Sequence, residues 1–192
     1  MIQSTPLPIV AFKSVELFET WLIEYHEYST GIWLKIFKKD TKIETVTYAQ
    51  ALDVALCYGW IDGQKQSFDE KAWLQKFCAR KEKSIWSKVN IGHVERLIRE
   101  GKMKPAGLRA IEKAKANGNW EKAYDSPSNM TIPEDFLIEL SNNKEAEIFF
   151  KSLNKTNLYA IGFRIQTAKK PETRAKRMKE IIEKLAKGEK FH

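Results

Sequence analysis

The residues with the clearest chemical potential lie in one short stretch, Trp60-Ile61-Asp62-Gly63, directly after Gly59. Trp60 and Asp62 are two positions apart, so in an extended segment their side chains point to the same side. An indole beside a carboxylate can form the wall and the edge of a ligand pocket. In the purely structural alternative, Trp60 belongs to the core and Asp62 closes a turn.

A second candidate segment runs from Arg80 to Asn90 and contains Ser84-Ile85-Trp86-Ser87. It combines hydroxyls, an indole and basic residues with a helix start, where free backbone N–H groups can bind an anion. Asn90 suits the N-cap of the helix that follows, and the structural alternative makes Trp86 the anchor of that helix. We expect Trp60 and Trp86 to approach each other across one pocket. The predicted ligand-binding residues are Trp60, Asp62, Arg80, Ser84, Trp86, Ser87 and Asn90.

Standard catalytic and metal-binding signatures are missing from the sequence. It contains no GxSxG, no Walker lysine loop, no GxGxxG and no HExxH. The histidines His26, His93 and His192 do not have metal-ligand spacing. Cys57 and Cys78 form neither a CxxC nor a zinc pattern, and both end apolar segments, so we expect buried, reduced and poorly reactive thiols. No metal and no cofactor are predicted.

Composition is typical of a globular protein. Of the 192 residues, 43% are hydrophobic and 30% are charged, which is enough for a core under an ordinary polar surface. The N-terminus lacks a basic region before an apolar stretch and is interrupted by Pro6 and Pro8, so no signal peptide is expected. No run of about 18 apolar residues exists that could span a membrane. We therefore expect a cytoplasmic protein.

The net charge of +8 is concentrated at the C-terminal end. From Lys169 to Lys190 there are nine Lys or Arg residues and four Glu residues. The stripe Ala175, Met178, Ile182 and Leu185 predicts a helix that packs on the core. No aromatic residue lies among the basic ones, and this absence argues against nucleic-acid binding, because single strands bind by stacking as well as by charge.

Hydrophobic periodicity predicts an α+β fold. A helix over 47–57 is indicated by Thr47 and Gln50, which have the spacing of a capping box. The segment 31–38 reads as a central strand because both of its faces are bulky, and 64–68 with 72–77 reads as a hairpin. We expect a small, mostly antiparallel sheet of about three strands backed by helices, followed by an all-helical C-terminal half. The whole chain, 1–192, is predicted to be a single compact domain with a sheet portion at 12–80 and a helical portion at 84–190.

Six segments in order carry a resemblance to a known family. They are GIWLKIFKK at 31–39, ALCYGWIDG at 55–63, SIWSKVN at 84–90, GKMKPAG at 101–107, AKANGNW at 114–120 and AKKPETRAKR at 168–177. Together they resemble the YdeI/OmpD-associated family, also called bacteriocin-protection proteins. Members usually have a Pro-Arg-Arg-like run before the Ser-x-Trp-Ser motif, whereas this chain has Cys78-Ala79-Arg80-Lys81.

The resemblance implies a role in bacterial envelope stress or bacteriocin resistance, without a known reaction. It also implies a compact α+β fold with a site near the two candidate segments. We therefore expect a stress-related binding protein, more a binder than an enzyme, whose partner is an unidentified small molecule or protein. The alternatives are an enzyme that uses Asp62 as acid or base, and weak nucleic-acid binding through the basic C-terminal helix.

Overall fold

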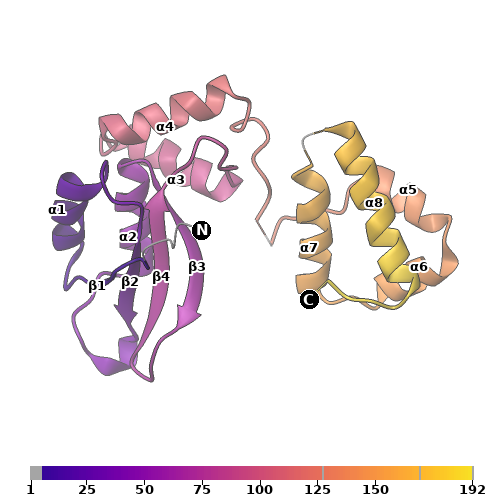
Figure 1. Ribbon diagram of the computed structural model, residues 1–192, viewed down its shortest axis with the longest axis horizontal. Coiled ribbons are helices and arrows are strands. Elements are labelled where there is room, and N and C mark those ends of the chain that lie inside the picture. The colour runs from indigo at the N-terminus through magenta and orange to yellow at the C-terminus, as the bar shows by residue number, and fades with distance from the viewer. Residues whose placement is uncertain (1–5, 127, 169, 192) are drawn as a thin grey trace. The chain divides into compact units, whose positions relative to one another are not determined.

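The chain divides into two compact units. The computed structural model describes residues 6–126, 128–168 and 170–191 (Figure 1). One unit contains the residues up to Ser84 together with Asn90–Glu121, and the other contains Ile85–Val89 together with the residues from Lys122 onward. The α+β class is confirmed, with the sheet in the N-terminal part and helices alone in the C-terminal part. The expectation of one compact domain over 1–192 stays a prediction.

The described part of the first unit contains a four-stranded mixed sheet with the order β1-β2-β4-β3. The strands are β1 (Ile9–Ala11), β2 (Ile32–Phe37), β3 (Trp60–Ser67) and β4 (Ala72–Ala79). The β2–β4 and β3–β4 pairs are antiparallel, and β2 is central as predicted. The fourth strand, β1, lies in the N-terminal segment 1–11, for which the sequence indicates only an extended arm. It pairs in parallel with β2, and the Trp33 amide donates to the Pro8 carbonyl at 2.9 Å, because a proline carbonyl still accepts although its nitrogen cannot donate.

Two helices of the first unit begin at capping residues that the sequence indicates. The helices are α1 (Val15–Tyr25), the short 3₁₀ helix η1 (Lys39–Thr41), α2 (Tyr48–Cys57), α3 (Lys88–Arg99), whose first two residues belong to the second unit, and α4 (Pro105–Ala116). Ser14 caps α1, and Thr47 with Gln50 forms the predicted capping box of α2. Helix α1 buries Phe18 and Leu22 against the sheet, where the rings of Phe18 and Phe77 lie 5.9 Å apart. The sheet and α1 thus share one apolar core.

Strand β3 begins earlier than the sequence indicated. Residues Trp60–Asp62 already pair with β4, whereas the sequence indicated a strand only at 64–68. The register shifts between Asp62 and Lys65, and the buried Gln75 side chain donates to the Gly63 carbonyl at 2.8 Å. The chain therefore bends near Gly63 through a β-bulge, because a bulge lets a strand turn without ending its pairing.

Helix α4 approaches the end of α2 through glycine. A Cβ atom built on Gly107 would overlap the Cys57 carbonyl and lie 2.6 Å from the Met103 side chain. Gly59, with φ of +74°, faces the Ala106 carbonyl in a similar way. These positions need glycine because the two backbones meet where a side chain would stand.

The second unit contains four helices in its described residues after Lys122. They are α5 (Glu134–Ser141), α6 (Lys144–Lys151), α7 (Lys155–Gln166) and α8 (Pro171–Ala186). Asn143 and Asn154 cap α6 and α7. Their core is apolar and consists of Phe136, Leu140, Ala146, Leu153, Ile161, Ile165, Met178, Ile181 and Leu185. This unit therefore has a hydrophobic core of its own.

The buried stripe of α8 differs from the predicted one. Met178 and Leu185 are buried and Ile182 packs on the core, but Ala175 is exposed and Ile181 is fully buried. The first turn of α8 is held instead by polar contacts, because Arg174 donates to both Asp135 carboxylate oxygens and to the Ile165 carbonyl. None of the helices in the described part of the chain has the length and apolar character needed to cross a membrane.

Candidate functional site

Trp60 is a core residue that also borders a cleft. It opens β3 and is 1% exposed, and its indole N–H donates to the His26 carbonyl at 3.0 Å. Its ring meets that of Trp21 edge-on, with centroids 5.6 Å apart. This arrangement matches the structural alternative for Trp60, since a buried indole usually finds one acceptor. It also fixes the ring rigidly at the cleft wall.

The cleft beside Trp60 has a volume of about 260 Å³ and brings together two predicted site residues, Trp60 and Arg80. Its wall also contains His26, Glu27, Tyr58, Gly59, Ala79, Ala106, Arg109, Ala110 and Lys113. Glu27 accepts from Arg109 at 3.3 Å and lies 3.8 Å from the His26 ring. Arg80, Arg109 and Lys113 thus face a single lining carboxylate, so the cleft has a positive excess.

Asp62 lies in β3 but is not among the residues that line this cleft. It is half-buried, and its carboxylate accepts the Tyr48 hydroxyl at 2.8 Å. Tyr48 is the first residue of α2 and also packs on Trp73, with ring centroids 6.2 Å apart. Asp62 therefore ties β3 to α2.

Ser84 belongs to a tight turn rather than to an open loop. Its hydroxyl accepts the Lys81 amide at 3.1 Å, and its amide donates to the Lys81 carbonyl at 2.9 Å. The Asn117 and Asn119 side chains donate to the Glu82 carbonyl at 3.0 and 3.2 Å. The turn is thereby fixed to the end of α4.

Asn90 does not have the position that the sequence suggested. Helix α3 begins at Lys88, so Asn90 lies inside its first turn and Ser87 directly precedes the helix. The N-cap prediction for Asn90 was wrong because the helix begins two residues earlier, at Lys88. Asn90 is 9% exposed.

Trp86 and Ser87 are part of the second unit and are buried there. Ser87 pairs with Tyr124 in a short parallel bridge. The Tyr124 amide donates to the Trp86 carbonyl at 3.0 Å, and the Lys88 amide donates to the Tyr124 carbonyl at 2.9 Å. Trp60 belongs to the first unit, so the approach of Trp60 and Trp86 stays a prediction.

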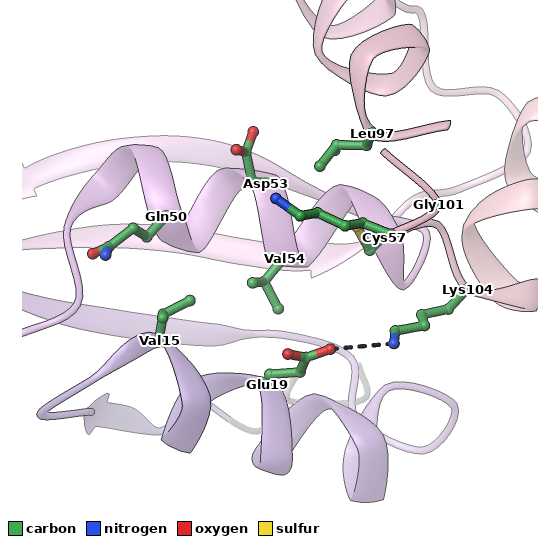
Figure 2. Close-up of a pocket in the computed structure, with 10 residues that line it drawn as sticks. Val15, Glu19, Gln50, Asp53, Val54, Cys57, Leu97, Gly101 and Lys104 are labelled. Carbon is green, nitrogen blue, oxygen red and sulfur yellow. Dashed lines mark ion pairs between the residues drawn. The ribbon is translucent and has the colours of Figure 1, made fainter. Parts of the chain in front are cut away.

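A larger pocket, of about 440 Å³, was not predicted from the sequence (Figure 2). Figure 2 shows Glu19 of α1 and Lys104 of the α3–α4 connection facing each other, with an ion pair at 3.5 Å. Asp53 of α2 and Lys102 are the other charged lining residues. The remaining wall is formed by Val15, Gln50, Val54, Cys57, Leu97 and Gly101. The acidic and basic groups are balanced, so this pocket has no net charge to favour an anion.

Asp53, at the wall of that pocket, is the centre of an ion network. Arg96 contacts both of its carboxylate oxygens, at 2.6 and 2.7 Å, and the His93 ring lies 3.2 Å away. The hydrogen bond that Arg96 donates to the Asp53 carboxylate raises the pKa of Arg96, and Lys102 holds the pKa of Glu100 below its usual value. His93 and Arg96 of α3 and Glu100 directly after the helix are spaced three and four apart, a spacing that could have indicated a shared face. Nothing local to Asp53 indicated that it meets this face.

Cys57 lines the larger pocket as an unreactive thiol. Burial, reinforced by the charges of Asp53 and Glu19, raises its pKa to about 11. The thiol is therefore protonated at neutral pH, and a protonated thiol is a poor nucleophile. Cys78 is also free but only half-buried, which differs from the expectation that both are buried. Among the described residues, no group of three His, Cys, Asp or Glu side chains could hold a metal ion.

Two family models match the chain, and the structural boundary after Glu121 falls in the stretch between them, although residues 85–89 of the second unit lie within the first match. Residues 10–110 match the model of a domain of unknown function, DUF8412. Residues 129–188 match the model described as bacteriocin-protection, YdeI or OmpD-associated. The comparison found no match among curated proteins or among solved structures.

The six segments that carry the sequence resemblance fall unevenly on these matches. AKKPETRAKR at 168–177 lies within the bacteriocin-protection match. The segments at 31–39, 55–63, 84–90 and 101–107 lie within the DUF8412 match, and the segment at 114–120 lies in neither. The bacteriocin-protection match is therefore narrower than the motifs suggested and covers most of the second unit.

Proposed function

The chain belongs to the DUF8412 family and carries a C-terminal bacteriocin-protection, YdeI or OmpD-associated domain, and from this premise we propose that it is a stress-related binding protein rather than an enzyme. We further propose that its first unit binds a small anionic group in the cleft beside Trp60. The match to a bacteriocin-protection domain supports the biological role, and the chemistry of the cleft supports the ligand class.

The observation that carries the ligand class is the gathering of Arg80, Arg109 and Lys113 around one cleft. Arginine presents a planar fork of donors that suits carboxylate and phosphate oxygens. Trp60 is held at the cleft wall by burial and by the hydrogen bond from its indole N–H to the His26 carbonyl. A rigid apolar wall beside several cations favours an anion attached to an apolar body.

The enzymatic alternative would use Asp62 as acid or base. Its carboxylate accepts the Tyr48 hydroxyl at the junction of β3 and α2, and the cleft is lined by other residues. A general acid or base must reach the reacting atom directly or through one water. This arrangement favours binding over acid–base chemistry in the cleft. Contributions of Asp62, Ser84, Trp86, Ser87 and Asn90 to a shared site stay predictions.

A thermal-shift titration with phosphate and with citrate tests the proposed cleft. A ligand that binds only the folded protein raises its melting temperature in a saturable way. We expect citrate or phosphate to do so for the wild type and to lose most of the effect in Arg109→Gln. Arg99→Gln is the matched control, because Arg99 is an exposed arginine of α3 outside the cleft lining.

A survival assay tests the biological role. The wild-type chain is expressed in a bacterium that a bacteriocin kills, and survival is compared with Arg109→Gln and Arg99→Gln. We expect protection by the wild type and by Arg99→Gln, and weaker protection by Arg109→Gln. Equal shifts and equal survival for both variants would rule out the cleft as the binding site.

A further inference from the structure

The second unit contains a groove that combines aromatic rings with arginines. It has a volume of about 570 Å³ and lies along α7. We call it the α7 groove, and its lining residues are Thr156, Tyr159, Ala160, Phe163, Arg164, Thr167, Arg177 and Phe191. The volume is within the range of about 300–1,000 Å³ that is usual for small-ligand sites.

One wall of the α7 groove is aromatic. Tyr159 and Phe163 lie one turn apart on α7, with ring centroids 5.8 Å apart, and both are half-buried. Tyr124 supports Phe163 edge-on from the other side at 4.9 Å. Phe191 is held by its amide, which donates to the buried Asn157 side chain at 3.1 Å. Half-buried rings fixed in this way present a surface on which a planar ligand can stack.

Both charged residues of the groove lining are arginines, and contacts with neighbouring residues hold each of them in place. Arg177 of α8 donates to the Arg164 carbonyl at 2.7 Å and to the Thr167 hydroxyl at 3.3 Å. The Arg164 guanidinium lies 6.0 Å from the Phe191 ring centre and pairs with Glu180 at 3.3 Å. Lys184 lies 5.2 Å from the same ring. Positive charge thus borders the aromatic wall on two sides.

This geometry supplies what the sequence of α8 lacks. The basic C-terminal stretch has no interleaved aromatic residue, and that absence argued against nucleic-acid binding. The structure brings Tyr159 and Phe163 of α7 to the same groove as Arg177 of α8. Arg164 adds one charge beside these rings on α7 itself, and Arg177 adds a second charge from α8, so the sequence of α8 alone could not show the combination.

We propose that the α7 groove binds a nucleotide. The base stacks on the Tyr159–Phe163 wall, and the phosphate is held by Arg164 and Arg177. Base–aromatic stacking together with arginine–phosphate pairing is the combination by which single strands are commonly bound. The same chemistry occurs in a free mononucleotide and in one unit of a single strand, and the experiment separates these two sources.

The test measures fluorescence anisotropy of a fluorescein-labelled ten-residue oligothymidylate with the full chain, in a salt series, and with AMP as competitor. The Arg164→Gln variant is compared with Lys151→Gln. Lys151 is a matched control, because it also forms a surface ion pair, with Glu147 at 2.6 Å, but on α6. Losing a charge-assisted hydrogen bond predicts about tenfold weaker binding for Arg164→Gln, and about a twofold change or less for Lys151→Gln.

A second variant, Tyr159→Leu, tests stacking separately from charge. It is expected to weaken binding about tenfold while leaving the salt dependence unchanged, because stacking releases no counterions. Arg164→Gln should instead lower the slope of log affinity against log salt by about 1. If Tyr159→Leu does not fold, as judged by circular dichroism, the comparison of Arg164→Gln with Lys151→Gln still tests the proposal.

Oligonucleotide binding that AMP displaces at comparable affinity supports a free nucleotide as the ligand. Oligonucleotide binding that AMP does not displace supports a single strand. Absence of binding to both probes overturns the proposal. It is also overturned if Arg164→Gln and Lys151→Gln weaken binding equally, because affinity would then come from general charge.

Discussion

Each of the two units is stabilised internally by a different kind of contact. In the first unit, many of the contacts between segments far apart in the sequence are made by the backbone. Ile32 of β2 pairs with Phe77 of β4, and α4 meets α2 at Gly107. In the second unit, side chains of consecutive helices interlock, and Phe136 and Leu185 lie in the same apolar core. The first unit should therefore be sensitive to added atoms, and the second to lost or charged side chains.

The binding surfaces of the two units differ in the same manner. The pockets of the first unit are rich in charged side chains that the helices and loops bring together from distant positions. The α7 groove is lined mostly by neighbours on one helix, with Arg177 and Phe191 added from outside. A site assembled from one helix tolerates changes elsewhere, whereas a site assembled from several elements depends on the whole unit.

The largest expected effect is in the second unit. Met178→Asp places a carboxylate at a position that is 6% exposed, in the apolar core of α8. An unpaired buried charge is among the few changes that cost more than about 4 kcal/mol. We expect the variant to lose the helicity of this unit, which far-UV circular dichroism measures.

The matched control changes charge on the same helix without touching the core. Lys176→Glu combined with Lys179→Glu alters two exposed residues of α8 and should leave the protein folded. Equal loss of helicity in both variants would contradict the packing role of the stripe. The same experiment tests the single-domain prediction. Five of the six tryptophans are in the first unit, so a single domain requires Met178→Asp to shift their fluorescence transition as well.

The next effect is in the first unit and comes from adding one carbon. In Gly107→Ala the new Cβ would overlap the Cys57 carbonyl, which is backbone and cannot turn aside. We expect a loss of about 1–3 kcal/mol in the free energy of unfolding, since overpacking forces the backbone to shift. Chemical denaturation followed by tryptophan fluorescence measures it.

Gly92→Ala is the matched control for this substitution. Gly92 lies inside α3, and a Cβ there would have no atom within 4 Å. Alanine in a helix interior is favoured over glycine, so this change should stabilise by about 0.5–1 kcal/mol. A destabilised Gly92→Ala, or an unaffected Gly107→Ala, would contradict the described approach of α4 to α2.

Features written in a local pattern were predictable from the sequence. The capping box at Thr47 and Gln50, the helix break at Gly59 and the central position of β2 all depend on residues close in the chain or on the character of one segment. Capping, positive φ and facial hydrophobicity are properties of single segments, so a single sequence contains them. Strand β1 was missed because its three residues carry too little pattern.

The site was less predictable because it depends on which segments meet. Trp60 and Arg80 were both chosen from their own motifs and line one cleft, but Arg109 and Lys113 of α4 could not be attached to it by spacing. The contact between Asp53 and Arg96 spans 43 positions, and no period in the sequence encodes such a distance. Tertiary contacts of this kind follow from packing rather than from local propensity.

A smaller effect is expected where charge links helices of the first unit. Asp53→Asn removes the carboxylate that accepts two hydrogen bonds from Arg96 and lies beside His93. Both side chains are about one-third exposed, so we expect a loss of about 1–2 kcal/mol, towards the lower end for charged hydrogen bonds. Urea denaturation measures it, with Asp40→Asn in the exposed η1 helix as control. Equal stability of the two variants would leave the network without an energetic role.

The smallest effect concerns the charge link of the second unit and its dependence on pH. Arg174 holds the pKa of Asp135 below its usual value of 3.8 through hydrogen bonds from its Nε and Nη2 atoms, and Asp135 is half exposed. Because the pKa of Asp135 is lower in the folded state, the Arg174–Asp135 pair stabilises the protein at pH values above 3.8, the usual pKa. The contribution is then lost as the pH falls through the lower folded pKa. Asp135→Asn should therefore cost about 1 kcal/mol or less at neutral pH, as for exposed ion pairs, and the difference from wild type should shrink towards zero near about pH 2. Circular dichroism melts at both pH values, with Glu134→Gln as the neighbouring control, measure the change. A difference that stays constant between the two pH values would show that Asp135 stabilises α5 by its shape and not by its charge.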